Sequence, residues 1–242
     1  MNLICLAAGK GSRFGTLGSY LQKCMYPIGL KPFLELTVRN LTQAGIEVST
    51  SSLTLVVGHF KEQIQSYFGD SYNGLKINYV VQDEALGTGH AIFTAYQKAA
   101  LSGPCVVWLA DSYVKADQFA SIIAHKSAVV MSLSADPDPA HAKTRVSLDG
   151  QFVTQAWEGD SDYVDIGLWK FSEAMVERMT SRKEGEYRIM PNLQDAILDG
   201  EKIGHLIEDE WLHLGGTEPT PEINTLRIAK RVRELEGMEA AT

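Results

Sequence analysis

Residues 3–25 read LICLAAGKGSRFGTLGSYLQKCM and join a short apolar run to a glycine-rich loop. The apolar run 3–6 predicts a buried strand, because it stops abruptly at small residues and glycine. Glycines permit positive φ and leave backbone N–H groups free to face an anion. Three cations accompany the glycines, and an arginine can bind two phosphate oxygens at once; they are Lys10, Arg13 and Lys23. The stretch therefore predicts a strand that leads into a phosphate-binding loop.

The glycine spacing differs from two well-known phosphate-binding patterns. Gly9-x-Gly11 followed by Gly15 is not the dinucleotide spacing G-x-G-x-x-G, and no G-x-x-x-x-G-K-[ST] is present. An ordinary turn at the start of an α/β domain is the simpler alternative, and the cations favour a phosphate site over it. A NAD-binding Rossmann domain would place an acidic residue about 20 residues further on, and Glu35 lies roughly there.

Composition restricts the class of protein. The 242 residues are 45% hydrophobic, which suits one large domain, and the net charge is −8. Without a basic stripe, a secretory leader or a long apolar run, we expect no nucleic-acid or membrane partner. The scattered Cys5, Cys24 and Cys105 lack zinc-ligand spacing, so we expect a cytoplasmic location.

Strand and helix patterns alternate along the first half of the chain. Strands are expected at 53–57, 76–81, 105–110 and 128–133, and helices at 33–44, 61–68, 88–100 and 117–125. This order predicts an α/β fold with a Rossmann-like, mainly parallel sheet flanked by helices. Ligands bind such sheets beyond the carboxyl ends of the strands. The loop 9–13, the segment after Val81 and Asp111 are expected to meet there.

The second half predicts a smaller mixed β/α portion. We expect a hairpin at 145–157, strands at 163–171 and 202–207, and helices from Ser172 toward Arg182, at 191–198 and at 218–235. No repeat or low-complexity linker separates the halves. The chain is therefore expected to form a single domain over 1–242, with parts at about 1–135 and about 136–242.

The segment Leu6-Ala7-Ala8-Gly9-Lys10-Gly11-Ser12-Arg13, followed by Lys23-Cys24-Met25, resembles the signature of nucleotidyltransferases that make nucleotide sugars. That signature runs L-A-A-G-x-G-x-R and then P-K-x-M, with Gln22 here in place of the proline. The resemblance implies transfer of NMP from an NTP to a phosphorylated acceptor, by default a sugar 1-phosphate, with release of pyrophosphate. It implies catalytic roles for Arg13 and Lys23. It also implies nucleotide binding by Leu6, Ala7, Ala8, Gly9, Gly11 and Ser12.

Residues 82–91, QDEALGTGHA, follow a predicted strand and open a predicted helix. Gln82 can offer a donor and an acceptor to a base edge, Gly87 lets the backbone approach a planar ligand, and Thr88 can cap the helix. A plain β–α connection is the alternative. The stretch 86–91 resembles the base-recognition loop of uridylyltransferases, which implies nucleotide contacts at Gln82, Gly87 and Thr88 and a preference for UTP or dTTP.

Asp111 follows the apolar strand pattern and is a candidate metal ligand. Mg²⁺ takes one or two carboxylates plus phosphate oxygens, although an aspartate in a turn is the simpler interpretation. The segment 108–111 resembles the family's [G/A]-D element, which binds Mg²⁺. The segment 211–217, WLHLGGT, resembles W-x-D-[I/L]-G-T and has His213 in place of a second metal-binding aspartate. Mg²⁺ is expected, with Mn²⁺ possible because imidazole suits softer ions.

The acceptor half departs further from the family. The segment 164–169, VDIGLW, resembles the N-A-G-I-Y strand that lies along the sugar phosphate, which implies acceptor binding at Gly167. Glu158 lies roughly where the family has E-K-P, without the lysine. Two alternatives therefore stay open: a cytidylyltransferase for a small phosphate such as phosphocholine, and a catalytically silent regulatory protein that binds a nucleotide sugar. An oligomer is also possible.

Overall fold

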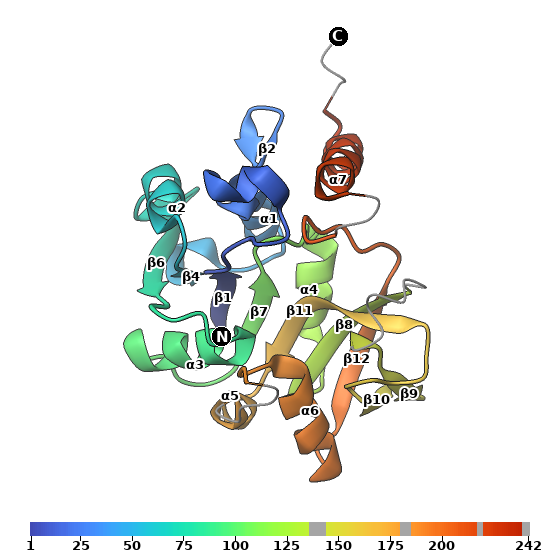
Figure 1. The fold of residues 1–242 in the computed structure, drawn as a ribbon. Coiled ribbons are helices and arrows are strands. Elements are labelled where there is room, and N and C mark those ends of the chain that lie inside the picture. Colours follow the sequence, from blue (N-terminus) through green and yellow to red (C-terminus); the bar gives the residue numbers. More distant parts are fainter. Residues whose placement is uncertain (136–143, 180–184, 217–219, 239–242) are drawn as a thin grey trace.

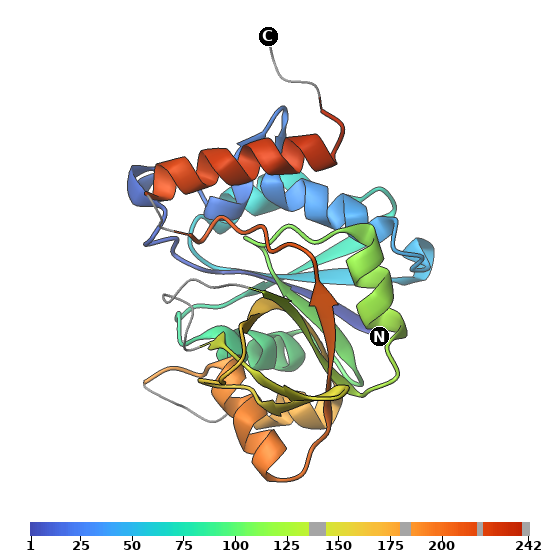
Figure 2. The same ribbon diagram turned by 90° about the vertical axis from the view of Figure 1, so that its right-hand side faces the viewer.

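The computed structural model describes residues 1–135, 144–179, 185–216 and 220–238. Its centre is a ten-stranded mixed sheet in the order β5-β6-β4-β1-β7-β11-β8-β12-β10-β9, with helices on both faces (Figures 1 and 2). The parallel part comprises β1 (Asn2–Ala7), β4 (Ser52–Val57), β6 (Leu75–Val81) and β7 (Cys105–Leu109). The predicted Rossmann-like sheet flanked by helices is confirmed.

Strand β1 is buried on both faces, which explains its continuous apolar sequence. Alternate residues enter opposite cores: Ile4 and Leu6 face one cluster, and Leu3 and Cys5 face the other. The first cluster is covered by α3 (Thr88–Lys98), α5 (Glu173–Arg178) and α6 (Ile189–Leu198). The second is covered by α1 (Phe33–Thr42), α2 (Lys61–Phe68) and α4 (Ala116–Ala124). Three layers result, as Figure 2 shows.

The second half of the chain extends the same sheet. Strand β11 (Tyr163–Phe171) lies between β7 and β8 (Val129–Ala135) and runs antiparallel to both. The sheet continues through β12 (Ile203–Glu208), β10 (Phe152–Gln155) and β9 (Ser147–Asp149). The expected mixed portion is confirmed, and its strands belong to the same sheet as the parallel strands.

Several boundaries differ from the sequence expectations. The helix expected to end at residue 100 ends at Lys98, and the helix expected from residue 191 begins at Ile189. The expected continuation of α5 to Arg182 and the expected start of the last helix at Glu218 lie outside the described residues. Short elements not expected from the sequence are β2 (Pro27–Ile28), β3 (Lys31–Pro32), β5 (Ser71–Tyr72) and 3-10 turns at Gly15–Ser19, Lys23–Met25 and Val48–Thr50.

Helix α7 (Pro221–Leu235) packs beside the N-terminal loop. Its Ile228 and Val232 share a small core with Phe14 and Ile28. The side chain of Thr220 caps the helix by accepting the backbone N–H of Ile223. Among the described residues, no helix has both the length and the apolar character needed to cross a membrane.

The loop before α3 is bonded to the second half of the chain through backbone groups. Gly89 N–H donates to the Tyr187 carbonyl at 2.7 Å, and Tyr187 N–H donates to the Leu86 carbonyl at 2.8 Å. A Cβ on Gly87 would lie 2.5 Å from the Tyr187 oxygen, and its φ is +114°. Glycine is therefore required at residue 87 by a neighbouring backbone.

We expect Gly87→Ala to lower the free energy of unfolding by about 2 kcal/mol or more, because it combines a positive φ with a backbone clash. Gly45→Ala is the matched control, since Gly45 has φ +79° and a Cβ there would meet no atom within 4 Å. Denaturant unfolding of both variants measures the difference. Equal losses at the two positions would contradict the role assigned to the Tyr187 contact.

Candidate active site

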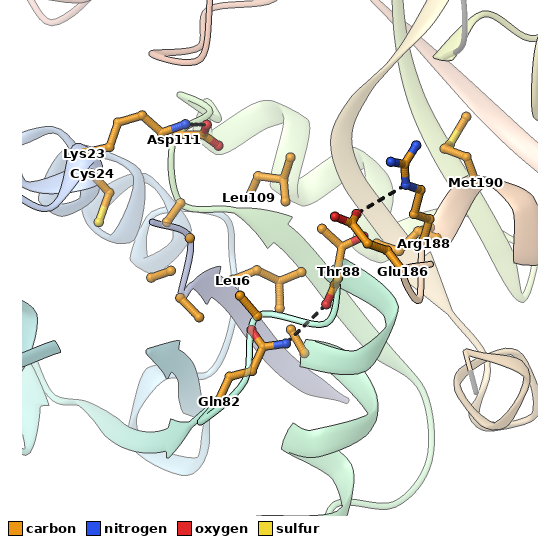
Figure 3. A pocket seen from close by; sticks show the side chains of 18 of the residues that line it. Leu6, Lys23, Cys24, Gln82, Thr88, Leu109, Asp111, Glu186, Arg188 and Met190 are labelled. Carbon is orange, nitrogen blue, oxygen red and sulfur yellow. Dashed lines mark hydrogen bonds and ion pairs between the residues drawn. The ribbon is translucent and has the colours of Figure 1, made fainter. Parts of the chain in front are cut away.

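A cavity of about 550 Å³ lies beyond the carboxyl ends of the parallel strands. Figure 3 shows Lys23 and Asp111 on one wall and Glu186, Arg188 and Met190 on the other. The predicted residues that line it are Leu6, Ala7, Ala8, Gly9, Arg13, Lys23, Gln82, Gly87, Thr88 and Asp111. The loop, the segment after β6 and the end of β7 therefore meet as expected from the strand order.

Five other predicted site residues are not among those that line the cavity: Gly11, Ser12, Glu158, Gly167 and His213. Gly11 instead shapes the loop, with φ +63° and a carbonyl that accepts the Phe14 N–H at 2.8 Å. Near Glu158, the neighbouring Trp157 lines the cavity. Near Gly167, Asp165 and Trp169 line it. These two segments therefore contribute to the cavity lining through residues other than the predicted ones.

Gln22 holds the glycine-rich loop in shape. Its Nε2 donates to the carbonyls of Ala7 at 2.9 Å and Gly9 at 3.1 Å. Its Oε1 accepts the backbone N–H of Cys24 at 3.2 Å, at the start of the turn that carries Lys23. Gln22 is buried. One side chain therefore fixes the loop relative to Lys23, a role that the sequence did not reveal.

Lys23 and Asp111 form an ion pair at the edge of the cavity. Burial raises the pKa of Asp111, and the adjacent Lys23 ammonium outweighs this effect and holds the pKa below its ordinary value. Asp111 is therefore ionised at neutral pH. It presents a hard carboxylate beside the loop that carries Arg13.

His213 is brought beside Asp111 by pairing of two chain segments. Leu214 N–H donates to the Asp111 carbonyl at 2.9 Å. The His213 ring stacks on Trp211, with ring centroids 3.9 Å apart, and its Nδ1 accepts the Gly215 N–H at 3.1 Å. Because Nδ1 accepts this bond, the proton of the neutral ring lies on Nε2. The ring is then oriented as a donor through Nε2.

Gln82 is oriented by its surroundings. Its Nε2 donates to the Gly87 carbonyl at 3.2 Å and lies 3.0 Å from His90 Nδ1. A carbonyl oxygen can only accept, so the amide nitrogen must face Gly87. Both amide hydrogens then have partners within the protein. The atom that Gln82 can offer to a ligand is Oε1, an acceptor.

Glu35, the candidate ribose-binding acid of a NAD site, lies elsewhere. It is buried on α1, where its carboxylate accepts hydrogen bonds from Lys31, Tyr67 and Tyr72. Glu35 does not line the cavity. The sequence feature that favoured NAD binding is therefore accounted for by this cluster of hydrogen bonds.

The wall opposite Asp111 contains residues that the sequence analysis did not select. The Arg188 guanidinium lies 5.9 Å from the centroid of the Trp157 ring, and its Nε donates to Glu186 at 3.3 Å. These three residues line the cavity. An arginine that precedes a helix carries no sequence signal of this position, because long-range packing brings it to Trp157.

Asp165 lies on β11 next to a register irregularity that spans residues 165–169 and contains Gly167 at φ +82°. Burial raises the pKa of Asp165 to about 7, although N–H groups of Trp169 and Gly167 lower it. A carboxyl group with this pKa is only partly ionised near neutral pH. At pH values where the unfolded chain would ionise Asp165, keeping this carboxyl group protonated lowers the free energy of unfolding.

We expect Asp165→Asn to gain stability relative to the wild type as pH rises from 4 to 8. The unfolded wild type releases the Asp165 proton near pH 4, whereas the folded protein keeps it until about pH 7, so wild-type stability falls between these values. The difference should grow by up to about 4 kcal/mol. Urea unfolding at several pH values measures it, with the exposed Asp162→Asn as control. A pH-independent difference would contradict this account of Asp165.

A family model described as "Nucleotidyl transferase" matches residues 2–225. The bifunctional protein GlmU of Methanococcus maripaludis is 26% identical over 245 residues, covering 98% of this chain and 57% of that protein. GlmU of Exiguobacterium is 35% identical over 223 residues, covering 84% of this chain and 46% of that protein. The chain thus spans about half the length of these relatives. D-glycero-alpha-D-manno-heptose 1-phosphate guanylyltransferase of Aneurinibacillus thermoaerophilus is 41% identical over 98 residues, 40% of this chain and 41% of that enzyme.

Solved structures share the fold. A UDP-glucose pyrophosphorylase complexed with UDP-glucose has a TM-score of 0.78 at 20% identity, covering 97% of this chain and 98% of that one. A putative glucose-1-phosphate thymidylyltransferase from Bacillus anthracis has a TM-score of 0.79 at 19% identity, covering 100% of this chain and 98% of that one. With the family match across residues 2–225, the sequence resemblance is confirmed: the chain belongs to the nucleotidyl transferase family.

Proposed function

We propose that the protein transfers NMP from an NTP to a phosphorylated acceptor, a sugar 1-phosphate, giving an NDP-sugar and pyrophosphate. A phosphate oxygen of the acceptor attacks the α-phosphorus, and the bond to the bridging oxygen of the β-phosphate breaks. The observation that carries the proposal is one cavity lined by Arg13 of the glycine-rich loop, by Gln82 and by the Lys23–Asp111 pair. Each group suits one part of a nucleoside triphosphate.

The proposed roles follow from charge. Arg13 stabilises the leaving pyrophosphate, and Lys23 holds the α-phosphate or the acceptor phosphate. The residues act by positioning the reactants and stabilising charge, without a covalent intermediate. The nucleotide occupies the part formed by about 1–135, and the acceptor occupies the part formed by about 136–242. The names of the GlmU and heptose 1-phosphate guanylyltransferase relatives support a sugar phosphate as acceptor.

We propose Mg²⁺ as the cofactor, held by Asp111. Among the described residues, no group of three or more His, Cys, Asp or Glu side chains could hold an ion. A single carboxylate plus phosphate oxygens and water is a usual environment for Mg²⁺, and Asp111 is ionised and lines the cavity. When bound, the ion would offset the charge of the phosphates. His213 is not a ligand in this proposal, because Nδ1 accepts from Gly215 and Nε2 carries the proton.

We expect Asp111→Asn to reduce turnover at least about 100-fold, since loss of the carboxylate removes a metal effect worth several kcal/mol. His213→Ala should keep turnover within about threefold and retain the Mg²⁺ preference. Metal titrations of pyrophosphate release measure both effects. A wild-type preference for Mn²⁺ that disappears in His213→Ala would show that His213 binds the metal.

Base preference follows from the orientation of Gln82. Oε1 can only accept, and the ring N3–H of uracil or thymine donates from the centre of the base edge. Cytosine and adenine have a ring nitrogen that accepts at this position. Gln82 Oε1 would then face another acceptor and would lack a hydrogen bond. Guanine also has a ring N–H, so GTP ranks second. Together with the uridylyltransferase-like loop 86–91, this favours UTP or dTTP.

A matrix of ATP, GTP, CTP, UTP and dTTP against hexose 1-phosphates and phosphocholine tests the proposed function by pyrophosphate release. We expect UTP or dTTP to exceed CTP and ATP by about tenfold or more, because an unpaired polar group in the site penalises the wrong base. Gln82→Leu should reduce this ratio. Fastest release with CTP and phosphocholine would favour the cytidylyltransferase alternative, and no release from any pair would favour a silent binding protein.

A further inference from the structure

Helix α2 holds the glycine-rich segment through the side chain of Gln63. Its Oε1 accepts the backbone N–H of Gln22 at 2.8 Å, and its Nε2 donates to the backbone carbonyl of Tyr20 at 2.9 Å. Both distances are those of ordinary amide hydrogen bonds. One amide therefore pairs with the backbone acceptor and the backbone donor on either side of Leu21, as a neighbouring strand would. The segment cannot shift here without breaking two hydrogen bonds.

A close approach between two backbones brings α2 within reach of this segment. A Cβ on Gly58 would lie 2.9 Å from the Ala8 carbonyl oxygen, so the turn after β4 packs directly against the glycine-rich loop. Phe60 then adopts the left-handed conformation, with φ 52° and ψ 34°, which is uncommon for a residue with a side chain. Helix α2 starts at the next residue, and Gln63 lies in its first turn.

Gln22 connects the Gln63 contact to the phosphate-binding groups. Its backbone N–H is bonded to Gln63, and its side chain bonds both to the glycine-rich loop and to the turn that carries Lys23. Gln22 has φ −64°, the value that a proline ring imposes. The proline of the family signature would have neither an N–H nor a side-chain amide here. In this chain, hydrogen bonds hold the position, and one of them comes from a residue 41 positions further on.

We propose that Gln63 is a positioning residue for phosphate binding: through Gln22 it keeps Lys23 and the glycine-rich loop in the geometry that receives the phosphates of the NTP. The inference rests on the proposed function, because that function assigns these phosphates to Lys23 and Arg13. Gln63 itself does not line the cavity. It therefore acts without touching the nucleotide, and its loss should weaken binding of the phosphates without weakening binding of the base.

A purely structural role for Gln63 leads to a different expectation. Loss of its two hydrogen bonds would then lower the free energy of unfolding and leave the affinity of the folded protein unchanged. The base contacts another segment in our proposal, because Gln82 follows β6 and is held by Gly87 and His90. Phosphate binding and base binding can therefore be measured separately.

Three variants isolate the contact. Gln63→Leu removes both hydrogen bonds and keeps a side chain of similar size. Gln22→Pro removes the N–H that Gln63 accepts, and the double variant shows whether the two residues act together. Gln65→Leu is the matched control, because Gln65 lies on the same helix and takes no part in these two hydrogen bonds. Urea unfolding of each variant identifies conditions in which all of them are folded.

Tripolyphosphate with Mg²⁺ and uridine are the two probes, and titration calorimetry measures their binding. Gln63→Leu should weaken tripolyphosphate about tenfold and leave uridine unchanged, since residues that orient a site from behind commonly contribute a factor of this size. Gln65→Leu should change neither. In the Gln22→Pro background, the further loss from Gln63→Leu should shrink to about threefold, because one of the two hydrogen bonds is already absent.

Unchanged tripolyphosphate affinity in Gln63→Leu would overturn the positioning role, as would equal losses for tripolyphosphate and uridine, equal effects of Gln63→Leu with and without Gln22→Pro, or no binding of tripolyphosphate to the wild type. Pyrophosphate release tests the proposed function separately. If tripolyphosphate binding depends on Gln63 but no NTP is turned over, the positioning role stands and the reaction is wrong. If turnover occurs and Gln63→Leu binds tripolyphosphate like wild type, only the positioning role fails.

Discussion

The pairing of β7 with β11 fixes two parts of the cavity lining relative to each other. Strand β7 leads to Asp111, and its antiparallel neighbour β11 carries Asp165 and Trp169. Ladder hydrogen bonds join the strands, for example where Leu168 pairs with Trp108. The carboxylate that we propose as metal ligand and the cavity-lining residues of β11 are therefore positioned by one sheet. Sites built on paired strands are held more accurately than sites built on loops alone.

The loops around this sheet depend on it for their shape. Gln22 bonds to the carbonyls of Ala7 and Gly9 directly after β1, so the glycine-rich loop starts from a fixed strand end. On the other side, the backbone of Tyr187 bonds to the loop at Leu86 and Gly89. Glycine-rich segments lose much conformational entropy on ordering, and these bonds offset that cost. The loops that line the cavity are therefore held in place by bonds within the protein.

The sequence predicts the sheet better than it predicts the second half of the site. Apolar runs such as Leu3–Leu6 locate strands because burial on both faces leaves an uninterrupted local signal. The cavity-lining positions of Asp111 and Gln82 follow from the strand order. The family resemblance implies acceptor binding by Glu158 and Gly167, but their neighbours line the cavity. Which residue of a segment faces inward depends on the irregularity in β11 and on long-range packing, and neither leaves a pattern in the sequence.

The orientation of His213 also could not be predicted from the sequence. Its tautomer is set by the Gly215 N–H, through a hydrogen bond between two residues of the same loop.

Charge pairing connects these features to the proposed chemistry. Asp111 is neutralised by Lys23, and Glu186 by Arg188, so both walls carry ions that already have partners. Removing one partner from a buried pair is costly because a bare charge remains. In the reaction that we propose, a phosphate with its metal ion would avoid that cost, since Lys23 would pair with the phosphate and Asp111 would hold the ion. An isolated metal or an isolated phosphate offers only half of this exchange. On this proposal the pair would favour a metal–nucleotide complex over either component, in a protein whose net charge of −8 otherwise disfavours polyphosphates.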